Sequence, residues 1–110
     1  MIIREVVNKL GLQVLAGEEY LGREVQGGYV ADLLSCVMAG AEPKALWITL
    51  QTHTNIVAVA SLNELSAIII AEGATIPQAT LDKAAQQSVV ILSSPDPIYK
   101  TVGRLIALGV

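Results

Sequence analysis

The chain has 110 residues, 53% hydrophobic and only 15% charged, with a formal net charge of −3 at pH 7. Disorder is excluded, because a disordered chain combines low hydrophobicity with high charge. A membrane span is excluded too: the longest apolar runs, residues 56–60 and 67–71, are far shorter than the roughly 20 residues that a spanning helix needs.

The first third of the chain predicts a helix and two short strands. Residues 2–10 place apolar side chains at the i, i+3, i+4 spacing of an amphipathic helix. Residues 12–15 predict a short strand. Residues 23–30 alternate weakly around Gly27-Gly28, which predicts a strand interrupted by a bend. If this pair forms the bend, Gly28→Ala should lower stability, because glycine tolerates positive φ and alanine does not.

A helix is predicted to follow this strand. Asp32 is a suitable N-cap for a helix through Met38. Cys36 lies on that helix and is expected to be buried as a small hydrophobic residue. Because it is the only cysteine, it also excludes an internal disulfide framework and a multi-thiolate metal site.

From residue 45 onward, strands and helices alternate. The predicted strands are residues 45–50, 67–71 and 88–92, and the predicted helices are residues 56–65, 77–87 and a last segment that ends near 108. Near-continuous aliphatic strands separated by helices are typical of a mostly parallel sheet with helices on both faces. We therefore expect a single α/β domain over residues 1–110, with Trp47 packed in the core and its N–H hydrogen-bonded.

The sequence contains no recognisable catalytic set. Neither Gly-x-x-x-x-Gly-Lys-Ser/Thr nor Gly-x-Gly-x-x-Gly is present, so a kinase or NTPase has no candidate machinery. No serine stands in a nucleophile-elbow sequence, and a single histidine cannot form a two-His or three-His metal site. Glu18, Glu19 and Glu24 are expected at a solvated edge. We expect no enzymatic activity, no cofactor and no metal.

His53 marks the most suggestive polar stretch, Gln51-Thr52-His53-Thr54-Asn55. It follows a core strand and precedes a helix, at the edge where open α/β sheets bind ligands and where helix N-termini offer N–H groups to anions. A small polar pocket from Gln51, Thr52, His53 and Thr54, with Ser93 and Ser94, is one interpretation. The other is that they only cap a helix, as Thr and Asn commonly do.

Composition also indicates the class of partner. The acidic balance and the absence of Phe argue against nucleic acid. The aliphatic excess is larger than a small core needs, which indicates an interface and favours a homodimer or a partner protein. The charge pair Arg4-Glu5 stands where a signal peptide would enter its apolar core, so we expect a cytoplasmic protein without membrane attachment.

Two long stretches carry a resemblance to a known family. GREVQGGYVADLLS at residues 22–35 and QTHTNIVAVA at residues 51–60, with shorter matches at 37–39 and 46–49, resemble the DRTGG domain family. Arg23 and the Gly27-Gly28 pair fit the letters of the family name, whereas Gly22 and Gln26 stand where the family has Asp and Thr.

The resemblance implies an accessory domain. Such domains sit beside phosphate acetyltransferase domains and between CBS modules of some inorganic pyrophosphatases, and they are similar to the N-terminal domain of HPr kinase/phosphorylase. There the kinase activity belongs to a separate phosphate-loop domain, whose motif this chain lacks. The family therefore implies a small α/β fold and a regulatory or dimerising role.

Two functional hypotheses are open. The first is a stand-alone, non-catalytic regulatory module that homodimerises through an aliphatic face. The alternative is a small-ligand sensor for a nucleotide or another phosphorylated, anionic metabolite. Its candidate ligand-binding residues are Gly27, Gly28, Asp32, Gln51, Thr52, His53 and Thr54.

Overall fold

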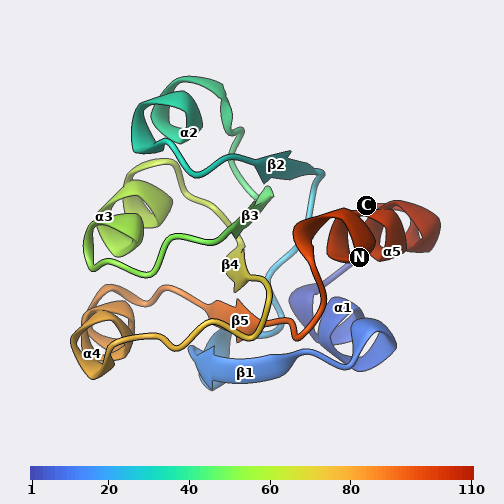
Figure 1. Ribbon diagram of the computed structural model, residues 1–110, viewed down its shortest axis with the longest axis horizontal. Coiled ribbons are helices and arrows are strands. Elements are labelled where there is room, and N and C mark those ends of the chain that lie inside the picture. Colours follow the sequence, from blue (N-terminus) through green and yellow to red (C-terminus); the bar gives the residue numbers. More distant parts are fainter.

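Five strands form one sheet in the order β1-β5-β4-β3-β2 in the computed structural model, which describes residues 1–110 (Figure 1). The strands are β1 (Gln13–Ala16), β2 (Gly28–Val30), β3 (Leu46–Thr49), β4 (Ala67–Ile70) and β5 (Ile91–Ser93). Strands β2 to β5 are mutually parallel, and β1 pairs antiparallel with β5. The expected mostly parallel sheet is confirmed.

Five α-helices cover the two faces of this sheet. They are α1 (Ile3–Leu10), α2 (Leu34–Gly40), α3 (Asn55–Leu62), α4 (Gln78–Gln87) and α5 (Ile98–Leu108), with a 3-10 turn at Glu18–Tyr20. The crossover helices α2, α3 and α4 lie on one face, and α1 and α5 lie on the other (Figure 1). This division arises because parallel strands taken in sequential order, joined by right-handed crossovers, place their helices on one face.

Alternation along the strands produces two separate cores. Trp47, Ile68 and Ile70 face α2–α4, whereas Leu46 and Ile48 face α1 and α5. Because both faces of the central strands are buried, their sequences are aliphatic throughout, as the parallel-sheet pattern predicts. Trp47 is fully buried, and its Nε1–H donates to the carbonyl of Ala31 at 2.8 Å, so both expectations for it are confirmed.

Helix α2 differs from its prediction in two respects. Its N-cap is Leu33, not Asp32, whose carboxylate is directed instead to β3. Cys36 is exposed, so its predicted burial is wrong. The reason is position: α2 covers the edge strand β2, and of its own residues only Val37 is buried.

The carboxyl ends of the parallel strands meet along one edge of the sheet, called here the carboxyl edge. Their amino ends meet along the opposite edge, the amino edge. The connections at these edges position the candidate functional residues. None of the helices is both long and apolar enough to cross a bilayer.

Candidate functional site

The carboxyl edge brings together most of the candidate ligand-binding residues. Asp32 follows β2, and residues 51–54 follow β3, its neighbour in the sheet. Asp32, Gln51 and His53 are exposed, and Thr52 and Thr54 are half-buried. These five side chains therefore share one region, as their positions after adjacent parallel strands predict.

Asp32 connects the ends of the two strands. Its Oδ1 accepts hydrogen bonds from the buried hydroxyl of Thr49 and from the backbone N–H of Leu50, each at 2.8 Å. Gln51 also contacts Asp32, because its side-chain amide donates to the backbone carbonyl of Asp32 at 3.1 Å. Asp32 is therefore a structural link at this edge, and its negative charge stays at the candidate site.

His53 contacts the first residue of α3 and lies one position before its N-cap, Thr54. Its Nδ1 lies 2.6 Å from Asn55 Oδ1 and 3.2 Å from the backbone N of Asn55. The nitrogen donates to the oxygen in one tautomer and accepts from the N–H in the other. In either case the imidazole contacts Asn55, while Nε2 makes no hydrogen bond within the chain. The N-cap of α3 is Thr54, and its side chain makes no capping hydrogen bond, so capping by the threonines is not observed.

The backbone before α3 has unused donors. The N–H groups of Thr52, His53 and Thr54 donate to no acceptor within the chain. The carbonyl of Thr52 is held by the hydroxyl of Thr80 at 2.7 Å, which fixes the loop against α4. Three consecutive N–H groups at a helix N-terminus are a favourable setting for an anion.

Gly27 and Gly28 lie at the other edge of the sheet. Gly28 opens β2 and pairs with Leu46, the first residue of β3, whereas His53 follows the last residue of β3. The structure does not bring the glycine pair and the His53 stretch into one site. The bend itself is present, but the positive φ of 76° belongs to Gly27 and not to Gly28.

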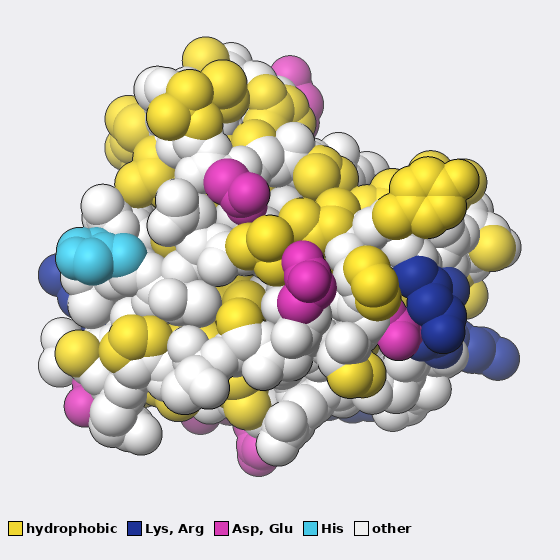
Figure 2. Space-filling model, viewed as in Figure 1, with side chains coloured by type: hydrophobic (Ala, Val, Ile, Leu, Met, Phe, Trp, Pro, Cys, Tyr) yellow, Lys and Arg dark blue, Asp and Glu magenta, His cyan; other side chains and the backbone are white.

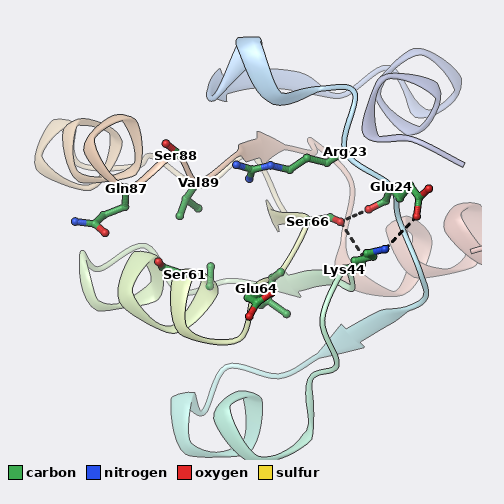
Figure 3. A pocket seen from close by; sticks show the side chains of 11 residues that line it. Arg23, Glu24, Lys44, Ser61, Glu64, Ser66, Gln87, Ser88 and Val89 are labelled. Atoms are coloured by element: carbon green, nitrogen blue, oxygen red, sulfur yellow. Dashed lines mark hydrogen bonds and ion pairs between the residues drawn. The ribbon is translucent and has the colours of Figure 1, made fainter.

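The amino edge contains a pocket of about 440 Å³ that sequence reasoning missed (Figure 3). Its lining combines charged and hydroxyl side chains with a few apolar ones: Arg23, Glu24, Lys44, Ala60, Ser61, Glu64, Leu65, Ser66, Gln87, Ser88 and Val89. These residues come from four separate segments, so no local pattern predicts that they meet. Arg23 is the one lining residue that fits the letters of the family name, so it is the partial signal that the sequence offers.

A second pocket of about 510 Å³ lies beside β1, at the carboxyl edge of β5. Ser93 lines it together with uncharged residues of the loop after β4, among them Thr75 and Ile76. Ser94, expected with Ser93 in a polar pocket, is buried and hydrogen-bonds the hydroxyl of Thr101 at 2.9 Å. The two serines therefore have different surroundings.

No three His, Cys, Asp or Glu side chains gather where they could hold a metal ion. Of the predicted solvated acids, Glu18 and Glu19 are exposed, and Glu24 forms an exposed ion pair with Lys44 at 3.2 Å.

Comparison with known proteins assigns the fold and the family. The chain is similar to the CBS and DRTGG domains of the regulatory region of Clostridium perfringens pyrophosphatase, solved in complex with the activator diadenosine tetraphosphate. The TM-score is 0.73 at 14% identity, over 96% of this chain and 46% of that one, so the chain spans about half of that regulatory region. No curated protein matches the sequence. The DRTGG domain model matches residues 5–108, and the chain therefore belongs to the DRTGG domain family.

Proposed function

We propose that the chain is a single, non-catalytic regulatory domain that self-associates through an apolar surface formed by β2, α2 and the end of β3. The observation that carries this proposal is a set of four large hydrophobic side chains exposed along the β2 edge of the sheet, Val30, Leu33, Met38 and Leu50, called here the β2–α2 surface. Val30 pairs with Ile48 and faces the side of α1 and α5, whereas Met38 lies on α2, so the set lines both sides of the edge strand. The exposed fractions of the four side chains, in the order named, are 48%, 63%, 50% and 38%. They account for half of the large hydrophobic residues exposed on the molecule, which supports an association site there.

Local contacts hold this surface together. The hydroxyl of Tyr29 donates to the carbonyl of Cys36 at 3.1 Å, which fixes α2 against β2. Leu50 is held beside the start of α2, because its N–H donates to Asp32. Figure 2 shows hydrophobic side chains gathered over α2. Val30 and Met38 therefore lie on regular elements, and Leu33 and Leu50 lie directly beside the ends of α2 and β3.

A second copy of the chain is the partner that fits best. Strand β2 is an edge strand, so its outer side presents unpaired backbone groups beside the exposed aliphatic residues. A two-fold interface uses the same patch on both subunits, and an uncharged aliphatic patch is self-complementary. The regulatory role is supported by the family, one member of which forms part of a pyrophosphatase regulatory region.

Sedimentation velocity at micromolar concentration tests the proposal. We expect a dimer for the unmodified chain and a monomer for Leu33→Glu, because a carboxylate would be buried in the apolar interface. Ile106→Glu is the matched control, since Ile106 is equally exposed at 66% but lies on α5, and this variant should remain a dimer. A monomeric unmodified chain, or a dimeric Leu33→Glu, would refute the interface.

A second candidate function is the sensing of a nucleotide or another phosphorylated metabolite at the carboxyl edge. The free N–H groups of Thr52, His53 and Thr54 favour an anion there. The similar pyrophosphatase region was solved with diadenosine tetraphosphate, which supports an anionic ligand of this kind. Asp32 opposes it electrostatically, so we place this function second.

A thermal-shift series with diadenosine tetraphosphate, ATP, AMP and inorganic phosphate tests ligand sensing. A ligand that binds only the folded state raises the melting temperature with its concentration. His53→Ala should abolish the rise if the imidazole contacts the ligand. An unchanged melting temperature with all four compounds would count against the sensor.

A further inference from the structure

The amino-edge pocket has no part in the proposed function and offers a site of its own. It lies between the ends of α3 and α4 and the segment that leads into β2 (Figure 3). The free N–H groups of residues 52–54 and the β2–α2 surface belong to other residues. Binding at the amino-edge pocket therefore requires neither dimerisation nor ligand sensing at the carboxyl edge.

Three residues that line the pocket have backbone conformations in which glycine is the usual residue. Lys44, Glu64 and Ser88 have left-handed backbone conformations, with φ of 69°, 55° and 57°. Each stands shortly before a parallel strand, and Glu64 and Ser88 lie at helix C-terminal ends, where glycine is most common because it has no Cβ. Only one other non-glycine residue of the chain, Glu72, has a positive φ. A left-handed backbone is unfavourable for a residue with a Cβ. Three such residues at one pocket therefore indicate that their side chains have a function there.

Structural contacts account for two of these three side chains. Lys44 pairs with Glu24 at 3.2 Å, and the Ser88 hydroxyl hydrogen-bonds the hydroxyl of Tyr20 at 3.0 Å. Glu64 makes no side-chain hydrogen bond and no ion pair. Its carboxylate is therefore a charged group on the pocket wall without a structural role.

Arg23 supplies an opposite charge that is also unpaired. Its guanidinium lies 4.5 Å from the centre of the Tyr20 ring and forms no ion pair with a carboxylate. Since Tyr20 is held by Ser88, the ring gives the guanidinium a fixed support. Figure 3 shows Arg23 reaching from the segment before β2 toward Val89, across the pocket from Ser61 and Glu64. A planar guanidinium with free donors is suited to a carboxylate, which it binds through two parallel hydrogen bonds.

The pocket thus carries both signs of charge. Helices α3 and α4 both end there, at Leu62 and Gln87, and the last carbonyls of a helix carry partial negative charge that attracts cations. The Glu64 carboxylate adds to this attraction for a cation. A polyphosphate, in contrast, would be repelled by these carbonyls and by the carboxylates of Glu24 and Glu64. Ala60, Leu65 and Val89 add apolar contacts. A ligand with one anionic group, one ammonium group and a small side chain matches this lining.

We propose that the amino-edge pocket binds a free α-amino acid. The ligand carboxylate binds the Arg23 guanidinium, and its ammonium group binds the Glu64 carboxylate beside the carbonyl ends of α3 and α4. The volume of about 440 Å³ accommodates an amino acid with its side chain. The chain then acts as an amino-acid-binding module.

The test uses the full chain, labelled with 15N, and each of the twenty L-amino acids at about 10 mM. At least one amino acid should saturably shift the amide signals of Arg23, Glu64 and Ser88. Its N-acetyl derivative lacks the ammonium group and its amide derivative lacks the carboxylate. Each should bind about tenfold more weakly or worse, because each leaves one charged group of the pocket unpaired. Absence of saturable shifts with all twenty, or equal binding of either derivative, would overturn the proposal.

A pair of glycine substitutions separates binding from folding. Glu64→Gly relieves the left-handed backbone, so its melting temperature should rise or stay level while the dissociation constant increases about tenfold or more. Glu72→Gly is the matched control: its φ of 61° gives the same relief outside the pocket, and its affinity should be unchanged. Arg23→Gln should weaken binding of the amino acid but not of its amide derivative. Unchanged affinity in Glu64→Gly would overturn the assignment.

Discussion

The carboxylate of Asp32 accepts a 2.8 Å hydrogen bond from the hydroxyl of Thr49, a contact that joins the ends of β2 and β3. Thr49 is fully buried and Asp32 is exposed, so the bond spans the boundary between core and solvent. It fixes the start of the loop that contains His53 and the position of Leu50 in the β2–α2 surface. The proposed dimer and the proposed ligand sensing at the carboxyl edge therefore both depend on this link.

Thr49→Val should destabilise the fold by about 1–2 kcal/mol, because it removes the donor to Asp32 and also the acceptor of the Gln51 N–H. Asp32→Ala should cost at least as much, since it leaves both the buried hydroxyl of Thr49 and the N–H of Leu50 without their acceptor. Urea unfolding measures both, and the double variant should cost less than the sum. Thr75→Val, at an exposed threonine without a side-chain hydrogen bond, serves as the control. Strict additivity would mean that the contact contributes nothing.

Trp47, a side chain buried in the core, provides a second test of the fold. Trp47→Phe removes the hydrogen bond to the carbonyl of Ala31 and leaves a small cavity, with an expected loss of about 1–3 kcal/mol. Because it is the only tryptophan, unfolding should be followed by circular dichroism. Tyr99→Phe, at a side chain that is 92% exposed, should leave stability unchanged. An equally small effect in both variants would show that the indole N–H is dispensable.

Local patterns were sufficient to predict most elements of the fold. The aliphatic runs at residues 45–50 and 67–71 contain β3 and β4, because strands buried on both faces need apolar residues at every position. Helix α1 is predicted by its 3.6-residue periodicity and ends at Leu10, with Gly11 as a left-handed C-cap. The antiparallel pairing of β1 with β5 joins segments far apart in sequence, and no local pattern encodes it.

The candidate site was predicted only in part, for the same reason. Asp32 and residues 51–54 share the carboxyl edge because they follow neighbouring parallel strands, which sequence order anticipates. Gly27-Gly28 is a candidate because its backbone amides could bind an anion, and it lies at the opposite edge. The amino-edge pocket depends on Arg23, Glu64 and Ser88 meeting in space and on left-handed residues that are not glycine. Neither property can be seen in a window of sequence.

The two glycines of the bend should respond differently to alanine. Gly27→Ala should cost about 1–2 kcal/mol, because its φ of 76° is unfavourable for any residue with a Cβ, although the space around it is open. Gly28→Ala should be nearly neutral, since its Cβ would lie 3.6 Å from Ile48 Cδ1, an ordinary contact. Chemical denaturation of both variants measures the difference. A larger loss of stability for Gly28→Ala than for Gly27→Ala would contradict the assignment of the strained backbone to Gly27.

Gly40 tests how α2 supports the proposed dimer. A Cβ at Gly40 would lie 2.5 Å from the Tyr29 hydroxyl oxygen and 2.8 Å from its ring, closer than atoms can approach. Gly40→Ala should therefore displace Tyr29, break its hydrogen bond to Cys36, and shift α2 away from β2. We expect a loss of about 1–3 kcal/mol from overpacking and, in sedimentation velocity, a weaker dimer.

The matched control is Gly103→Ala, inside α5, where a Cβ would meet no neighbouring atom within 4 Å. Alanine is the better helix former, so this variant should gain roughly 0.5–1 kcal/mol and keep the dimer of the unmodified chain. Comparing the two variants removes any general effect of replacing a helical glycine. If Gly40→Ala is destabilised but its dimer is as strong as that of Gly103→Ala, then α2 is not part of the interface, and the outer edge of β2 alone must carry the association.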